Sequence, residues 1–193
     1  MGFTIETGTQ APDFSLPGVD GKTWSLGEFA SEEAVVVLFT CTHCPVAIAS
    51  EDRLVEKQTE YAERGVAFVA INSNEDEDHP TDSFDHMVQR AQEKGFNFPY
   101  LRDESQDVAK AYGAQRTPHY FLLDRERRVV YTGRECADPS NADQATAWEL
   151  WEAVDALLAG RPAPTAVTEA IGCNVKWWGR DAHWMPESLA DFG

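Results

Sequence analysis

The chain has 193 residues, 42% of them hydrophobic, which suits one sizeable hydrophobic core better than two ordinary domains. Its 33 acidic and 16 basic residues give a net charge of -17, which argues against nucleic acid or an anionic membrane as a partner. The longest apolar run, residues 34–39, is far shorter than the roughly 20 residues that a membrane-spanning helix needs. The first residues lack the basic and apolar segments of a secretory signal, so we expect a cytoplasmic protein.

The first half of the chain predicts a hairpin and then a strand, a helix and a second strand. Residues 19–26, with Gly21 among them, have the pattern of a hairpin. The valine-rich run 34–39 predicts a central strand that is buried on both faces. Apolar residues recur at helical spacing over 45–64, and residues 65–74 predict the next buried strand. The two strands should therefore be parallel, with the helix as their crossover.

The acidic run 74–80 predicts a solvated loop, because dense like charge and Pro80 oppose regular structure. A cation site is the weaker alternative there, since the run lacks the glycine and terminal glutamate of a calcium-binding loop. The later elements follow from periodicity and from glycine or turn signals. In chain order they are a helix over 81–94, an extended piece over 96–104, a helix over 105–113, a hairpin over 117–133 and a helix over 141–160.

Two cysteines, Cys41 and Cys44, lie at the junction of the predicted central strand and the helix. The unpaired amides and the dipole at a helix N-terminus favour an anion, so we expect the pKa of Cys41 to be lowered from about 8.5. In this interpretation Cys41 is the nucleophile, and Cys44, one turn inside the helix, is the resolving thiol. His43 can add a positive charge or a hydrogen bond close to the Cys41 sulfur, or it can be an exposed histidine without a role.

The remaining cysteines argue against a metal site. Zinc would need two ligands besides Cys41 and Cys44, but Cys136 and Cys173 stand alone, without a second C-x-x-C or a paired histidine. We therefore expect no metal and no cofactor. Cys136 is interpreted as a small residue in a loop. Cys173 is interpreted either as a residue buried under the tail or as an additional redox thiol that receives a disulfide from Cys41 or Cys44.

The order of these elements around "VVVLFTCTHCP" and "YGAQRTPHYFLLDRERRVVYTG" resembles the thioredoxin fold. The segment "GTQAPDFSLPGVDGKTWSLGEF" resembles the start of the redoxins, the group of alkyl hydroperoxide reductase, thiol-specific antioxidant and TlpA-like proteins. The tail "IGCNVKWWGRD" is similar to a GC-x-x-KW signature of a cytosolic redoxin subgroup. The resemblance implies an α/β fold of the thioredoxin-like class, with a central mixed sheet flanked by helices. We expect a redoxin domain over 1–160, opened by an N-terminal strand extension, and a C-terminal extension over 161–193 packed on it.

The resemblance also implies further site residues and partners. Pro118 matches the cis-proline of the family, and the backbone of Thr117 before it would pair with an extended substrate strand. The substrate would be a disulfide-containing protein or small molecule, and a separate electron donor would complete the cycle. In the tail, tryptophans would anchor the extension on the domain or form a homodimer contact: Trp177, Trp178 and Trp184.

Three functions remain open at this point. The first is thiol-disulfide exchange, in which Cys41 attacks a disulfide and Cys44 resolves the mixed disulfide. The second is reduction of hydroperoxides, although the peroxiredoxin motif P-x-x-x-T/S-x-x-C, aligned on Cys44, has Val37 and Cys41 at its proline and threonine positions. The third is a non-catalytic binding module that senses redox state.

Overall fold

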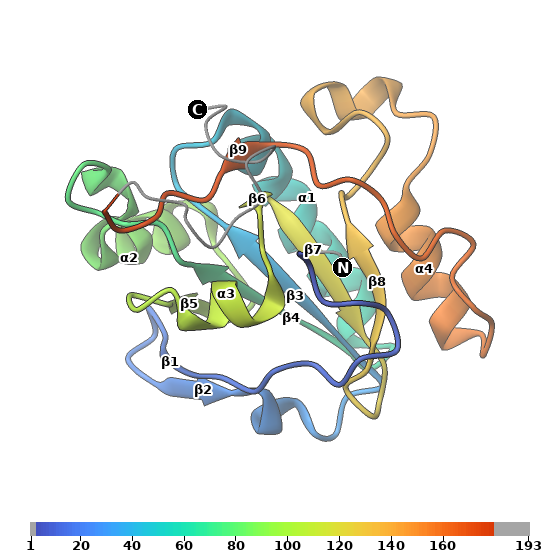
Figure 1. Ribbon diagram of the computed structural model, residues 1–193. Helices are drawn as coiled ribbons and strands as arrows, with labels where there is room; N and C mark the ends of the chain where they lie inside the picture. The colour runs from blue at the N-terminus through green and yellow to red at the C-terminus, as the bar shows by residue number, and fades with distance from the viewer. Residues whose placement is uncertain (1–2, 180–193) are drawn as a thin grey trace.

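A computed structural model describes residues 3–179 of the chain. Its centre is a five-stranded mixed sheet with the strand order β5-β4-β3-β7-β8 (Figure 1). Strands β3, β4 and β5 are parallel, and β7 and β8 are antiparallel to their neighbours. The strands span Ala34–Thr40 (β3), Val66–Asn72 (β4), Tyr100–Arg102 (β5), His119–Leu123 (β7) and Val129–Gly133 (β8). The predicted mixed α/β architecture is confirmed.

The central strand β3 divides the hydrophobic core into two layers. All of its residues are buried, as the continuous apolar run predicted. Because successive side chains of a strand point to opposite faces, Val35 and Val37 pack into one layer and Val36 into the other. Residues of α3 (Asp107–Tyr112) and of the N-terminal segment complete the first layer. The second layer is completed by α1 (Pro45–Ala62), α2 (Phe84–Lys94) and α4 (Glu149–Leu158).

The N-terminal hairpin exists but starts before the predicted range of 19–26. Its strands β1 (Ser15–Pro17) and β2 (Thr23–Ser25) pair antiparallel and lead into the short 3-10 helix η1 (Leu26–Phe29). The hairpin between β7 and β8 is also confirmed. None of the helices in residues 3–179 is both long and apolar enough to cross a bilayer.

Two helices begin more than two residues later than the sequence predicted. The first residues expected in the helix over 81–94 form the 3-10 helix η2 (Pro80–Asp82), and α2 begins at Phe84. The helix expected over 141–160 begins at Glu149. Its first predicted residues belong instead to the 3-10 segment η3 (Pro139–Gln144), where the Asp138 side chain accepts a hydrogen bond from the backbone amide of Asn141 at 3.1 Å.

The acidic loop is only partly solvated, so the prediction was wrong for its beginning. Asn74 and Glu75 are buried, whereas Glu77 and Asp78 are exposed. The buried residues carry specific hydrogen bonds, because a Glu75 carboxylate oxygen accepts from the amides of both Glu77 and Asp78. This loop is therefore folded against the domain and contributes to the site described below.

The C-terminal extension crosses the end of the sheet and adds a short strand, β9 (Cys173–Asn174), which pairs antiparallel with β6 (Arg116–Thr117) (Figure 1). Val175 and Trp177 then enter the core layer on the α3 side. The anchoring role expected of Trp177 agrees with this burial, whereas Trp178 is partly exposed and donates its indole N–H to the Glu104 carbonyl oxygen at 2.9 Å. Trp184 lies outside the described residues.

We expect Phe121→Ala to destabilise the fold strongly. Phe121 is fully buried on β7 and makes edge-on contacts with the rings of Phe39 and Tyr112, at centroid distances of 5.8 and 5.2 Å. Truncation should lower the free energy of unfolding by about 3–5 kcal/mol, measured by urea unfolding. Phe84→Ala, at a position that is 36% exposed, is the matched control. Equal losses in both variants would contradict the assignment of the core.

Candidate functional site

The two cysteines of the C-x-x-C sequence lie between the end of β3 and the start of α1. Cys41 follows the last residue of β3, and Cys44 is the N-cap of α1, with Pro45 at its first position. Proline is well tolerated there because the first amides of a helix have no partner within the helix. Both thiols are reduced, and the two residues are only 2% and 0% exposed, respectively. Both thiols are therefore shielded from solvent in this structure.

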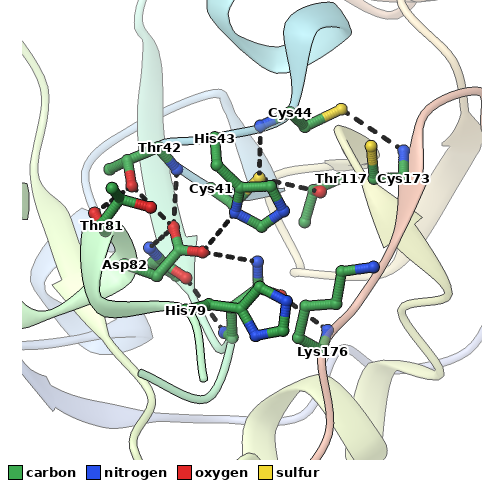
Figure 2. A network of polar contacts seen from close by, with 12 residues as sticks. Cys41, Thr42, His43, Cys44, His79, Thr81, Asp82, Thr117, Cys173 and Lys176 are labelled. Atoms are coloured by element: carbon green, nitrogen blue, oxygen red, sulfur yellow. Dashed lines mark hydrogen bonds and ion pairs between the residues drawn. The ribbon is translucent and has the colours of Figure 1, made fainter. Parts of the chain in front are cut away.

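Cys41 is surrounded by hydrogen-bonding groups. The backbone amide of Cys44 donates to its sulfur at 3.3 Å, and the Thr117 hydroxyl lies 3.1 Å from the same sulfur (Figure 2). Thr117 belongs to β6, and the peptide bond that joins it to Pro118 is cis. The structure thus brings Cys41, Cys44, Thr117 and Pro118 together, although the segments that carry them lie far apart in the sequence.

Cys44 faces a third thiol. The backbone amide of Cys173 in β9 donates a hydrogen bond to the Cys44 sulfur at 3.4 Å, and the side chains of Cys173 and Cys44 lie next to each other (Figure 2). Cys136 is buried in the loop after β8 and is not part of this cluster, as expected of a small loop residue.

The electrostatics of the pair differ from the sequence prediction. The hydrogen bond from the Cys41 thiol, together with the amides of Ala47 and Cys173, outweighs burial and lowers the pKa of Cys44 to about 4. The same contact with Cys44, burial and the Asp82 carboxylate raise the pKa of Cys41. The expected lowering at Cys41 was wrong because these three influences outweigh the hydrogen bonds from the Thr117 side chain and the His43 backbone, which lower its pKa.

A buried carboxylate, Asp82, organises the loop that carries the dithiol. Its side chain is inaccessible to solvent and accepts hydrogen bonds from the Thr42 amide at 2.7 Å and from the Thr42 hydroxyl at 2.8 Å. The side-chain amides of Asn72 and Asn74 each donate to it at 3.0 Å. Burial opposes ionisation, but the hydrogen bonds from His43, Thr42, Asn74 and Asn72 hold the pKa of Asp82 below its usual range.

The imidazole of His43 pairs with this carboxylate. Its Nδ1 atom lies 2.6 Å from an Asp82 oxygen, and its ring stacks on the ring of His79 at a centroid distance of 5.4 Å. A positive charge on His43 would therefore lie against the Asp82 carboxylate, which offsets its effect on the dithiol. The donor atoms of His43, Asp82 and Cys41 lie within 4.8 Å of one another, and the tuning role of His43 stays a prediction.

Cys41, His43 and Asp82 also form a group that could hold a metal ion, because their donor atoms lie within 4.8 Å of one another. A thiolate, an imidazole and a carboxylate are all ligands that zinc accepts. In this structure, however, His43 and Asp82 bond to each other, and Asp82 has four further hydrogen bonds from Thr42, Asn72 and Asn74. A metal bound there would have to replace the contact between His43 and Asp82.

The backbone edge beside the cis-proline is occupied by the chain itself. Thr117 pairs with Cys173 in the antiparallel register of β6 and β9. The sequence prediction assigned this edge to a substrate strand, and in the structure β9 takes that place. His119, the residue after Pro118, is fully buried, and burial lowers its pKa to about 3. This histidine is consequently neutral at physiological pH.

Several residues of the site were missed by the sequence analysis. Asp82 belonged to a predicted helix, and Thr42 was only a spacer between the cysteines. Asn72 and Asn74 had one detectable signal, because two amide side chains at the end of a buried strand are candidates for the edge of the sheet where sites form. Their partner Asp82 could not be identified without the path of the loop.

With this geometry in view, comparisons with known proteins identify the class of the chain. The family model Redoxin matches residues 6–146. The chain belongs to the Redoxin family. Its fold is thioredoxin-like, as shown by the thioredoxin domain of a thiol-disulfide oxidoreductase from Bacteroides vulgatus, which is 19% identical with a TM-score of 0.60 over 73% of this chain and 97% of that domain.

Particular relatives are more similar in sequence. The chain is 30% identical over 124 residues to the thiol-disulfide oxidoreductase ResA of Halalkalibacterium halodurans, a match that covers 64% of this chain and 65% of ResA. The match thus spans less than two thirds of the length of that relative. A hypothetical protein from Sinorhizobium meliloti 1021 is 42% identical, with a TM-score of 0.85 over 91% of this chain and 97% of its own.

Asp82→Asn should destabilise the protein and change how its stability depends on pH. The pKa of Asp82 is depressed in the fold, so its contribution is complete above the unfolded value of about 3.9 and is lost as pH falls below it. An amide cannot accept all of these hydrogen bonds, and we expect a loss of about 2–4 kcal/mol in the free energy of unfolding at pH 7. Urea unfolding between pH 7 and pH 3 measures both effects.

In that experiment the difference between wild type and Asp82→Asn should shrink as the pH falls below about 4, because Asp82 is then protonated in the unfolded wild-type chain while it is still ionised in the fold. The exposed Asp143→Asn is the control and should change little. A difference that is constant from pH 7 to pH 3 would contradict an ionised Asp82 in the fold.

The reduced protein should contain one thiolate at neutral pH, on Cys44. Ultraviolet absorbance of the thiolate should titrate with a midpoint of about 4 in wild type, as the pKa of Cys44 requires. Cys44→Ser should remove this transition, and Cys136→Ser should leave it unchanged. If the transition instead disappeared in Cys41→Ser and survived in Cys44→Ser, the thiolate would be on Cys41.

Proposed function

We propose that the protein is a thiol-disulfide oxidoreductase that uses Cys41 and Cys44 as a redox-active pair. The observation that carries the proposal is the meeting of this reduced pair with the Thr117–Pro118 segment, where the Thr117 hydroxyl lies 3.1 Å from the Cys41 sulfur. The naming of the ResA relative as a thiol-disulfide oxidoreductase supports the same activity. The substrate is a disulfide-containing protein or small molecule.

The reaction begins with attack by Cys41. In the reduced pair the proton is on Cys41 and the negative charge on Cys44, so Cys44 takes the proton as the Cys41 sulfur bonds to one sulfur of the substrate disulfide. That disulfide breaks, and its other sulfur leaves as a thiolate. The product of this step is a mixed disulfide between Cys41 and the substrate.

The second step releases the reduced substrate. Cys44 gives its proton to the substrate thiolate released in the first step and attacks the Cys41 sulfur, which forms the Cys41–Cys44 disulfide and expels the second substrate thiolate. That thiolate takes its proton from water. When negative charge develops on the Cys41 sulfur, the Thr117 hydroxyl can donate a hydrogen bond to that sulfur.

The surrounding residues position the pair. Asp82 holds the Thr42 amide and the His43 ring, so the loop between the cysteines has a defined shape. A dithiol donor must then reduce the Cys41–Cys44 disulfide to complete the cycle, and the proposal places this cycle in the cytoplasm. Run in reverse, the same steps oxidise a dithiol substrate.

Substitution of the cysteines tests the proposal. With dithiothreitol as reductant, wild type should reduce insulin or oxidised glutathione, and Cys41→Ser should lose turnover by about 100-fold or more, because the attacking sulfur is gone. Cys44→Ser should react once and retain the substrate as a mixed disulfide on Cys41, detected as added mass. Cys136→Ser is the matched control and should retain turnover.

Hydrogen-peroxide consumption by the same variants separates the alternatives. Rapid peroxide turnover by wild type, with little disulfide reduction, would replace the proposal by a thiol peroxidase. If wild type shows neither activity, the dithiol serves a binding or sensing role instead. A Cys41→Ser variant as active as wild type in disulfide reduction would remove Cys41 from the mechanism.

A further inference from the structure

We propose that Cys173 is a third redox thiol, which takes over the disulfide from the Cys41–Cys44 pair by forming a Cys44–Cys173 bond. The inference rests on the proposed function, because the dithiol must first be oxidised by a disulfide substrate. It adds a step to that reaction and gives the C-terminal extension a chemical role.

The position of Cys173 is the first observation. Cys173 pairs with Thr117, the residue before the cis-proline, in the antiparallel pairing of β9 and β6. The backbone amide of Cys173 donates a hydrogen bond to the Cys44 sulfur at 3.4 Å. Its side chain packs in the same small cluster as Cys41 and Cys44 (Figure 2). An extended strand that presents a cysteine to a dithiol is the arrangement expected of a disulfide substrate, and here the chain supplies it from its own tail.

The second observation is that β9 is held in this place by dedicated contacts. An Nη atom of Arg116 donates to the Gly172 carbonyl oxygen at 3.0 Å and to the Asn174 side-chain oxygen at 2.9 Å. Gly172 has a φ of 151°, and a Cβ atom at this position would lie 2.1 Å from the Thr117 carbonyl oxygen. Only glycine permits so close an approach of the tail to the cis-proline segment.

The tail is also tied to the loop that carries Asp82. The Lys176 amide donates to the Asn74 side-chain oxygen at 2.9 Å, while the side-chain amide of Asn74 donates to Asp82 at 3.0 Å. The Glu75 amide donates to the Lys176 carbonyl oxygen at 2.9 Å. Cys173 is therefore anchored from both sides, and its distance from Cys44 follows from the same network that shapes the dithiol loop.

The step itself is an internal exchange and needs no added oxidant. The Cys173 thiol gives its proton to solvent, its sulfur bonds to the Cys44 sulfur, and the Cys41–Cys44 bond breaks with the electron pair on Cys41. The Cys41 thiolate then takes up a proton. One disulfide is exchanged for another, so the number of oxidised thiols does not change.

The charges around Cys173 oppose its ionisation while the Cys41–Cys44 pair is reduced. Burial and the hydrogen bond to Cys44 raise the pKa of Cys173 to about 11, while Lys176 and Arg116 act in the opposite direction. When Cys44 is part of a disulfide, its negative charge is gone and only burial still opposes ionisation of Cys173. Cys173 is also less buried than the two other cysteines, so the new disulfide is more accessible to an external reductant.

A single-turnover experiment tests the proposal. Reduced protein is mixed with one equivalent of oxidised glutathione, quenched in acid, alkylated with N-ethylmaleimide and mapped by peptide mass spectrometry. In wild type we expect a Cys44–Cys173 disulfide with Cys41 alkylated in most oxidised molecules. In Cys173→Ser we expect the Cys41–Cys44 disulfide instead, and Cys136→Ser, the matched control, should give the wild-type pattern.

Gly172→Ala provides a second variant in which all cysteines remain. The added Cβ should displace β9 from Thr117 and reduce the Cys44–Cys173 fraction severalfold, in favour of the Cys41–Cys44 disulfide; circular dichroism checks that the variant is folded. If Cys173 is alkylated in oxidised wild type as completely as Cys136, the proposal is overturned. If Cys173→Ser forms no Cys41–Cys44 disulfide, the proposed function itself fails, so the two failures are distinguishable.

Discussion

The buried carboxylate of Asp82 is the interaction on which the rest of the site depends. A charge without access to water is costly unless hydrogen bonds replace its hydration, and here Thr42, His43, Asn72 and Asn74 do so. These donors come from the dithiol loop, from the end of β4 and from the segment after it. Satisfying one carboxylate therefore joins three segments and determines where the loop with the two cysteines lies.

The start of α1 contributes to the difference between the pKa values of Cys41 and Cys44. Because Cys44 is the N-cap, the free amides at the helix start act on its sulfur, whereas Asp82 lies on the side of Cys41. The pKa of Cys44 is lowered and that of Cys41 is raised, which suits a reaction in which one sulfur attacks and the other accepts the proton.

The C-terminal extension changes the interpretation of the cis-proline segment. The edge at Thr117, which the sequence analysis assigned to an extended substrate strand, is paired with β9, and this brings Cys173 beside Cys44. The close contact at Gly172 shows that the tail is shaped for this place. In the proposed reaction a substrate strand at this edge would have to displace β9.

The sequence by itself determined the order of the main elements, the central strand β3 and the junction that carries Cys41 and Cys44, because hydrophobic periodicity and glycine stops are local signals. It also indicated the family, whose Redoxin model matches residues 6–146. Tertiary structure alone decided that Asp82 is drawn from a predicted helix into the site, that the thiolate belongs to Cys44, and that Cys173 meets the dithiol. Each of these depends on contacts between segments that are distant along the chain, and the burial and hydrogen bonds of such contacts exist only after folding.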